Sequence, residues 1–448
     1  MPRPNDRDLR ELAESVLAER PPGTDVEVYV RVEEQDEVLS ESTGSPRTLT
    51  RGGTGVSVRV AAGSRIGFAA TSDLSRHGLR RAVETASALA RLAVPGPGLP
   101  TPDRLAGPSG QDGAAGTSER EGAAPGGGGP AADGSPHAQL AELLSRAREL
   151  GLTPVTAAVT TTRRHQMVLS TRGVDTRNTF DWARSHLTAQ VAGPSGRPRQ
   201  LLAARVAGTP GPPRSDLVTD LSADLLPLRD LPLLRPPAGT ALLLEPFAAA
   251  KLLRPLVWAL DGTAVRAGKS PIRIGDPLLP PWLELVDDGR VGGGPLGAVT
   301  DDEGMPTRRV AHTSGGAVTA LLDPWRPDDP GGGGQVRRFG WAERPRPAAA
   351  NLSLSATGTG TPATDDRYIR VLDLGGVESS YNRATGDFQA QLQGILCQSD
   401  GTPEGYVQAP WSDNVVKALR RISWTGPECR FFPMESAIGG RRTRIEPP

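Results

Sequence analysis

The stretch from Ala241 to Leu253, ALLLEPFAAAKLL, constrains the fold most, because a short apolar run passes into a helical pattern through a single acidic residue. The pattern predicts a strand over Thr240 to Leu244 and a helix from Pro246 to Leu260, with Glu245 at the junction. A helix that carries catalytic zinc usually presents two histidines one turn apart, with a glutamate between them as general base. No histidine accompanies Glu245, so the sequence predicts no zinc site at this junction.

Four other motifs accompany this stretch along the chain: GVSVRVAAGSRIGFAATSDLS (Gly55 to Ser75), DDEGMPTRR (Asp301 to Arg309), PAAANLSLS around Asn351 and LDLGGVESSYNRATGDF (Leu372 to Phe388). In this order and spacing, they resemble the TldD/PmbA metallopeptidase family. The resemblance covers most of the chain apart from three Gly/Pro-rich stretches. It implies an α+β fold of two domains, with an N-terminal helix/sheet domain and a strand-rich C-terminal domain.

The resemblance can be carried over position by position. In the zinc-bearing members the matching helix reads His-Glu-Xaa-Xaa-Xaa-His, and a cysteine near the C-terminus completes the site. The two histidines fall on Leu244 and Ala249, and the glutamate falls on Glu245. Cys429 lies in the region that supplies the cysteine, but one thiolate cannot form a three-ligand zinc site. The resemblance therefore implies the zinc-free TldE (PmbA) type of subunit, with no catalytic, cofactor-binding or metal-binding residue of its own.

Composition excludes several classes of protein. The 448 residues suffice for two or three domains, and 51 basic side chains balance 51 acidic ones, which leaves no net field to attract nucleic acid or an anionic membrane. Two cysteines, Cys397 and Cys429, are too few for a disulfide framework. The chain begins with no apolar leader and contains no run of about 18 apolar residues that could span a bilayer. We expect a cytoplasmic protein whose partner is a protein or a peptide.

The first domain, residues 1–209, is predicted to combine helices with strands. Helical spacing of apolar residues predicts a helix around Leu9 to Leu17, and strict alternation from Val26 to Val32 predicts a strand with one buried face. The sequence then predicts a hairpin that turns at Gly63-Ser64, a helix from Leu74 to Ala93, a helix over Leu140 to Ala147 with Gly151 as its C-cap, and strand-like runs at Val155 to Thr162, Gln166 to Ser170 and Leu187 to Val191.

Gly- and Pro-rich stretches punctuate the chain. Residues 107–136 have almost no large apolar side chain, so the sequence predicts a disordered insertion there. The passage from Pro210 to Pro237 predicts the boundary before the second domain, residues 238–448, and Pro324 to Gly334 predicts an exposed loop. Strands dominate the second domain: Leu283 to Val286 into Asp287-Asp288, a hairpin over Ser314-Gly315-Gly316, Ile369 to Leu372, and Phe388 to Leu396.

Other candidate sites have simpler structural interpretations. The five histidines never fall three or four residues apart, so no helix face offers two imidazoles to one metal. An acidic cluster could hold a hard cation, but in the family the DDEG turn is structural and its Gly304 permits a tight turn, which favours a structural role. Glu245 has no metal-bound water to deprotonate, and we expect it to cap the following helix. The acidic cluster consists of Asp287, Asp288, Asp301, Asp302 and Glu303.

The function that the resemblance implies is that of a non-catalytic subunit in a TldD/TldE-type heterodimeric zinc peptidase. A zinc-bearing TldD-like partner would supply zinc, water and general base, while this chain would help to bind unfolded or leader peptides, for which an edge strand of the second domain is suited. Two other hypotheses remain open. The chain could be a stand-alone peptide-binding or scaffold protein, or a hydrolase that uses Cys397 or Cys429 as nucleophile.

Overall fold

The computed structural model describes residues 6–41, 45–101, 135–208, 215–292, 294–329, 332–356, 367–434 and 436–448. Helices and strands mix throughout the chain, which confirms the expected α+β class. Within these residues, no helix is both long enough and apolar enough to cross a membrane. Most of the predicted insertion, residues 107–134, lies outside the described residues.

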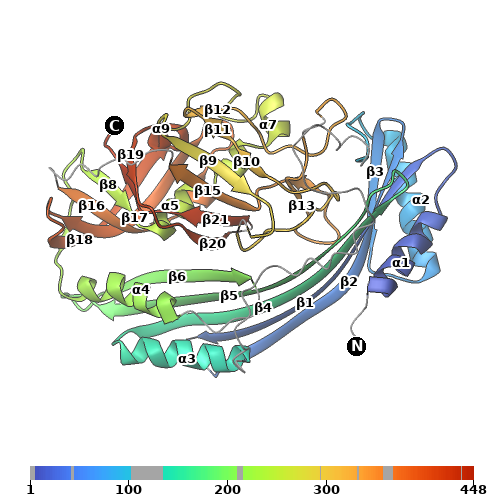
Figure 1. Ribbon diagram of the computed structural model, residues 1–448. Helices are drawn as coiled ribbons and strands as arrows, with labels where there is room; N and C mark the ends of the chain where they lie inside the picture. The colour runs from blue at the N-terminus through green and yellow to red at the C-terminus, as the bar shows by residue number, and fades with distance from the viewer. Residues whose placement is uncertain are drawn as a thin grey trace.

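An antiparallel six-stranded sheet forms the N-terminal part, with strand order β3-β2-β1-β4-β5-β6. Figure 1 shows that it is strongly curved, so that it has a concave and a convex face. The hairpin between β2 and β3 turns at Gly63-Ser64 as predicted. The strands are β1 (Asp25–Glu41), β2 (Arg47–Ala62), β3 (Arg65–Thr71), β4 (Thr153–Ser170), β5 (Asp175–Ala192) and β6 (Pro198–Gly208).

Strand β4 corrects the sequence analysis. Two separate runs were predicted, Val155 to Thr162 and Gln166 to Ser170, but one strand spans both. Arg163, Arg164 and His165 interrupt the apolar pattern, yet each pairs with β1 on one side and β5 on the other. Backbone pairing across three strands therefore continues through a segment whose side chains are polar. The predicted run Leu187 to Val191 is likewise only the end of the longer β5.

The helices of this part cover the convex face of the sheet (Figure 1). Apolar residues on their inner sides pack on Val26, Val28 and Val30 near one end of the sheet and on Val159 and Leu187 near the other. Gly151 follows the third helix with φ +77°, as the C-cap prediction requires. The helices are α1 (Asp6–Ala18), α2 (Arg76–Leu92), α3 (Pro136–Glu149), α4 (Ser215–Leu225) and the 3₁₀ turn η2 (Leu226–Arg229); α4 and η2 lie within the passage predicted as a domain boundary.

Both faces of β1 are buried, where the sequence predicts only one. Val28 and Val30 pack under α1 and α2, but Glu27, Tyr29 and Arg31, which alternate with them, are also buried. The C-terminal part of the chain lies over the concave face (Figure 1), and Arg338 within it contacts all three residues. The alternation of polar and apolar residues was therefore correct, and only the assumption that the polar face meets water was wrong.

The C-terminal part consists mainly of a seven-stranded sheet, β19-β22-β8-β16-β17-β18-β7, and a five-stranded sheet, β10-β9-β15-β21-β20. The first contains β7 (Leu233–Leu234), β8 (Ala241–Leu244), β16 (Tyr368–Gly375), β17 (Asp387–Cys397), β18 (Pro403–Asn414), β19 (Ile422–Thr425) and β22 (Thr443–Ile445). The second contains β9 (Leu283–Asp288), β10 (Arg309–Ala311), β15 (Asn351–Ala356), β20 (Arg430–Met434) and β21 (Ser436–Gly440).

Among the described residues, two short ribbons and five short helices complete this part. The ribbons are β11 (Thr313–Ser314) with β12 (Ala317–Val318), which is the predicted hairpin, and β13 (Val336–Arg337) with β14 (Arg346–Pro347). The helices are α5 (Pro246–Leu253), α6 (Leu256–Ala259), α7 (Gly262–Arg266), α8 (Val377–Ser380) and α9 (Val415–Arg420).

Helix α5 contacts both large C-terminal sheets, through β16 of one and through β20 and β21 of the other. Its alanines and leucines belong to the main hydrophobic core. The predicted helix from Pro246 to Leu260 is divided in two, because Pro255 has no N–H to continue the hydrogen-bonding pattern. The loop predicted at Pro324 to Gly334 is only partly exposed, since Trp325 is buried and Gly332 to Gly334 are buried as well.

Candidate functional site

The junction between β8 and α5 is where the sequence places the site. β8 lies between β16 and β22, so its end is surrounded by neighbouring strands. Leu244, the last residue of β8, and Ala249, in α5, are both buried in the hydrophobic core. Gly440 of β21 packs so closely that a Cβ atom there would come within 1.7 Å of the Pro246 carbonyl oxygen. The start of α5 is thus held in a tightly packed frame.

Glu245 is the N-cap residue of α5, but its side chain does not cap the helix. Arg370 of β16 donates from Nε to its Oε1 at 2.6 Å, and Arg442 donates from Nε to its Oε2 at 3.2 Å. Arg442 Nη2 also lies 3.0 Å from Oε1. The expectation that Glu245 caps the helix was therefore wrong, because two guanidinium groups take its carboxylate instead.

A cleft of about 370 Å³, here called the Glu245 cleft, opens beside this carboxylate. Asp224 of α4 joins the group through an ion pair to Arg370. Burial raises the pKa of Asp224 to about 6, with Glu245 and Asp220 adding to the rise and Arg370 opposing it. A partly buried carboxyl in a cleft with other carboxylates nearby is expected to behave in this way. The cleft is lined in part by Asp224, Glu245, Phe247, Arg370, Trp424 and Arg442.

The residues at this junction do not fit zinc. The two positions that would hold imidazoles carry the aliphatic side chains Leu244 and Ala249, and both carboxylate oxygens of Glu245 accept hydrogen bonds from arginines. Zinc in proteins requires at least three nitrogen, sulfur or oxygen ligands in a compact arrangement. In the described part of the chain, no three histidine, cysteine, aspartate or glutamate side chains gather closely enough to hold a metal.

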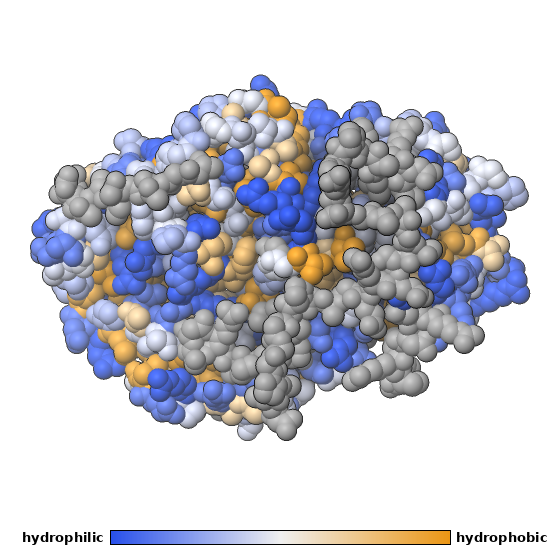
Figure 2. Space-filling view, viewed as in Figure 1, coloured by the Kyte–Doolittle hydropathy of each residue, from blue (hydrophilic) through white to orange (hydrophobic). Residues whose placement is uncertain are grey.

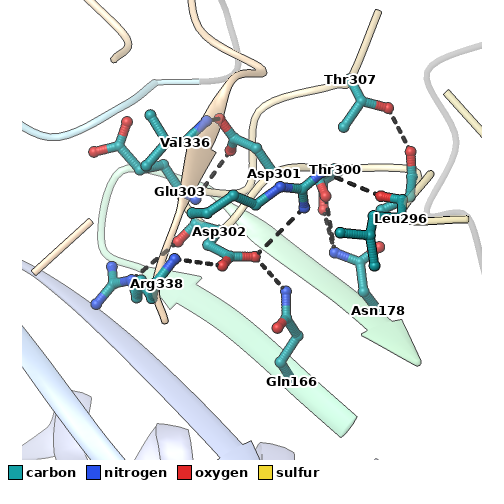
Figure 3. A network of polar contacts seen from close by, with 12 residues as sticks. Gln166, Asn178, Leu296, Thr300, Asp301, Asp302, Glu303, Thr307, Val336 and Arg338 are labelled. Atoms are coloured by element: carbon teal, nitrogen blue, oxygen red, sulfur yellow. Dashed lines mark hydrogen bonds and ion pairs between the residues drawn. The ribbon is translucent and has the colours of Figure 1, made fainter. Parts of the chain in front are cut away.

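The acidic turn from Asp301 to Gly304 has the structural role that the sequence analysis favoured (Figure 3). Asp301 Oδ1 accepts from the backbone N–H groups of Glu303 and Met305, both at 2.9 Å, and Oδ2 accepts from that of Val336 at 3.2 Å. Gly304 adopts φ +79°, which favours glycine. Burial, together with Glu303 and Asp302, raises the pKa of Asp301 to about 8.

The next two acidic residues of this turn reach the concave face of the N-terminal sheet. Asp302 Oδ1 accepts from Gln166 Nε2 of β4 at 2.7 Å (Figure 3), and Glu303 Oε1 accepts from Arg59 Nη1 of β2 at 2.6 Å. Arg338 completes the contact, because its Nη1 donates to Ser57 Oγ at 2.8 Å and its Nη2 pairs with Glu27. These side chains are buried and join the two parts of the chain.

We call this group the interface cluster: Glu27, Arg59, Gln166, Asp302, Glu303 and Arg338. Of these residues, only the two acidic residues of the turn were candidates from the sequence. Glu27 and Arg59 alternate with valines on their strands, and this pattern is typical of a sheet face that meets solvent. No local signal distinguishes that case from a side covered by another domain.

The remaining residues of the acidic cluster also form hydrogen bonds or ion pairs within the fold. Asp287 Oδ1 accepts from the backbone N–H groups of Ala350 (3.0 Å) and Asn351 (2.7 Å), which ties β9 to the start of β15. Its Oδ2 accepts from Gln335, whose amide also contacts the buried His312. Asp288 pairs with Arg290 at the surface. Each carboxylate of the predicted cluster thus has partners within the chain.

The two cysteines do not show the features of nucleophiles. Burial raises the pKa of both thiols, so they are protonated near neutral pH. Cys397 donates its thiol to the Ile395 carbonyl at 3.6 Å, and Cys429 lies beside Gly439 of β21. A catalytic cysteine needs a lowered pKa or an adjacent base. These surroundings disfavour the hypothesis of a cysteine hydrolase.

A second and larger cleft was not anticipated from the sequence. It has a volume of about 1090 Å³ and lies between the concave face of the N-terminal sheet and the C-terminal part. This central cleft adjoins the Glu245 cleft, because Leu202 and Phe247 line both. One wall includes Thr160, Arg184 and His186 of the sheet, and the other includes Lys251, Trp258 and Arg383.

Comparison with known protein families gives two matches in the chain. Residues 238–446 match the family described as the PmbA/TldA metallopeptidase C-terminal domain. Residues 44–90 match the family described as PmbA/TldA metallopeptidase domain 1. A search among curated protein sequences finds no match.

Solved structures show the same fold over nearly the whole chain. TldE from Thermococcus kodakarensis superimposes with a TM-score of 0.77 at 18% identity, covering 98% of each chain. Two proteins named as candidate modulators of DNA gyrase are also similar. The protein from Thermotoga maritima has a TM-score of 0.75 at 16% identity over 98% of each chain, and that from Bacteroides thetaiotaomicron has 0.68 at 14% over 99% of each. With both domain matches, the chain belongs to the TldD/PmbA metallopeptidase family, and its fold is similar to that of TldE.

Proposed function

We propose that this chain is the non-catalytic subunit of a TldD/TldE-type heterodimeric peptidase. In this proposal a zinc-bearing TldD-like partner cleaves the peptide, and this chain helps to hold an unfolded or leader peptide in place. The chain itself would need no cofactor. We further propose that it works in the cytoplasm and is organised as two domains, residues 1–209 and 238–448.

One observation carries the proposal: the family framework is kept while its metal-binding junction has been replaced. α5 still packs tightly against β21 at Gly440, yet Leu244 and Ala249 stand at the ligand positions. Arg370 and Arg442 bind Glu245, the one remaining acidic group of that motif. A junction that stays tightly packed without metal ligands is best explained if its surface must keep its shape. Binding of a partner subunit requires such a surface.

Strand β20 supports a role in holding an extended peptide. It is an edge strand of the five-stranded sheet, paired only with β21 in that sheet. Its residues border both clefts, Phe432 at the Glu245 cleft and Met434 at the central cleft. β20 also contacts β6 of the N-terminal sheet, so a peptide could pair only with the part of this edge that borders the clefts. Pairing of that kind uses main-chain hydrogen bonds and makes little demand on the peptide sequence.

Mixing experiments test the proposal. We expect the purified chain and a purified zinc-bearing homologue from the same genome to co-elute from a sizing column. Together they should show chelator-sensitive peptidase activity that neither shows alone. An obligate interface of this kind buries on the order of 2,000 Å² or more.

The stand-alone scaffold hypothesis makes the opposite prediction. If the zinc-bearing homologue is fully active by itself and does not co-elute with this chain, the scaffold interpretation replaces the proposed one. Peptidase activity of this chain alone, after removal of contaminating protein, would overturn both.

A further inference from the structure

The central cleft has an excess of positive charge in a protein whose net charge is zero. Its acidic lining residues are already paired: Glu378 lies 2.7 Å from Arg254, and Glu37 lies 3.9 Å from Arg51. Lys251 of α5 pairs with Asp373 of β16. Two further lining arginines, Arg184 and Arg383, have no carboxylate partner in the described part of the chain, and they stand on opposite walls.

Arg184 belongs to the wall formed by the sheet. It alternates along β5 with His186 and Thr188, which line the same cleft. Its Nε atom is buried without a hydrogen-bond partner among the described residues. Burial lowers the pKa of its guanidinium, the nearby Arg164 lowers it further, and Glu33 opposes the shift from a distance. An arginine remains charged in such a position, and no carboxylate among the described residues forms an ion pair with it.

Arg383 belongs to the opposite wall and is fixed in place by its surroundings. Its guanidinium lies 4.4 Å from the ring centroid of Trp258, which also stacks with Tyr381. The preceding Asn382 shapes the turn, because its Oδ1 accepts from the backbone N–H groups of Ala384 and Thr385. A side chain that is held before binding loses less entropy when a ligand arrives.

From this arrangement we infer that the central cleft binds the acidic side chains of an extended peptide, with Arg184 and Arg383 as the two anion-binding groups. This inference rests on the proposed function, because it takes the ligand to be a peptide. Arginine pairs with carboxylates through strong charge-assisted hydrogen bonds. A cleft lined by one sign of charge also focuses its field on an incoming ligand.

The dimensions of the cleft suit a peptide better than a small molecule. Pockets for small molecules usually measure about 300–1,000 Å³, and the central cleft alone exceeds that at about 1090 Å³. It is continued on one side by the Glu245 cleft and on the other by a cavity of about 290 Å³, which shares Gln35 and Arg184 with it. An extended chain could follow this row of cavities.

Fluorescence anisotropy with the isolated full-length chain tests the inference. Three labelled peptides of equal length would be compared: one with paired glutamates, one with glutamines at those positions and one with lysines. We expect the glutamate peptide to bind roughly tenfold more tightly than the glutamine peptide, because one charge-assisted contact is worth about that factor. The lysine peptide should bind most weakly, and the preference should decrease with salt.

Arginine variants test whether the preference for the glutamate peptide comes from the two proposed anion-binding residues. Arg184→Gln and Arg383→Gln should each weaken binding of the glutamate peptide several-fold and leave binding of the glutamine peptide nearly unchanged. Arg76→Gln removes the same charge from an exposed position on α2, outside the cleft, and should change nothing. Because Arg383 is exposed, its variant should fold even if Arg184→Gln does not.

Equal binding of all three peptides, no binding of any, or equal effects of Arg383→Gln and Arg76→Gln would overturn the inference. The outcome is separable from that of the proposed function. Charge-selective binding without activation of a zinc-bearing partner would leave the inference standing and defeat the heterodimer proposal. Activation without charge selectivity would do the reverse.

Discussion

Two glutamates in this protein are each held by arginine, but in different settings. Glu303 pairs with Arg59 in the interface cluster, where both side chains are at most 8% exposed. Glu245 pairs with Arg370 and Arg442, whose side chains are 25% and 50% exposed beside an open cleft. The first arrangement is sealed and fixes the two parts of the chain to each other. In the second, the Glu245 side chain is also only 8% exposed, but its arginines remain accessible to solvent and to a partner. The exposure of the arginines therefore separates a structural ion pair from one that is available for recognition.

Removing a buried charge from the interface cluster should have the largest effect on the free energy of unfolding. Arg338 is fully buried and donates to Ser57, pairs with Glu27 and contacts the ring of Tyr29. Arg338→Ala leaves Glu27 with only Arg59 as a cationic partner, and breaking a buried pair in this way costs about 3–5 kcal/mol. The free energy of unfolding, measured by urea titration, should fall by that amount.

The matched control is Arg326→Ala, which removes a surface pair with Asp328. Surface ion pairs contribute about 0–1 kcal/mol, so this variant should unfold at nearly the wild-type urea concentration. If the two variants lose the same free energy of unfolding, the interface cluster does not hold the two parts of the chain together.

The partly exposed Asp224 in the Glu245 cleft should make the stability of the protein depend on pH. The pKa of Asp224 is raised to about 6 in the folded chain from an ordinary value of 3.8. Its protonation therefore stabilises the fold fully below about pH 4, and this contribution is lost as the pH rises through about 6. Asp224→Asn is neutral at every pH. Its melting temperature relative to wild type should therefore rise between pH 5 and pH 8, by about one degree in a chain of this size.

Asp328→Asn provides the comparison for this pH experiment. Asp328 is exposed, and the neighbouring Arg326 lowers its pKa, so it stays ionised at both pH values. The difference between this variant and wild type should be constant from pH 5 to pH 8. A constant difference for Asp224→Asn as well would contradict the burial of Asp224 in the Glu245 cleft.

Glu245 itself should matter least for catalysis. In a reconstituted complex, Glu245→Gln is expected to leave peptidase activity within a few-fold of wild type, because two arginines bind the carboxylate and Leu244 and Ala249 offer no ligand to a metal. The equivalent glutamate-to-glutamine change in the zinc-bearing partner should cost about 100-fold or more, as removal of a true general base does. A loss of that size in this chain would show that Glu245 takes part in the chemistry.

The elements that the sequence predicted are those with local causes. The hairpin at Gly63-Ser64 and the cap at Gly151 depend on residues close together along the chain, and both were found. The pairing of Arg338 with Glu27 joins residues 311 positions apart, and no periodicity reports such a contact. For the same reason the sequence located Glu245 but not its two arginine partners, of which Arg442 lies 197 positions away.

We propose that the β8–α5 junction holds arginine-bound Glu245 in place of a metal. Elemental analysis of the purified full-length chain, after dialysis against zinc and then against metal-free buffer, tests it most directly. We predict no stoichiometric zinc, because Leu244 and Ala249 stand where ligands would be required. About one tightly bound zinc per chain, lost on substitution of Glu245 or Cys429, would contradict the account.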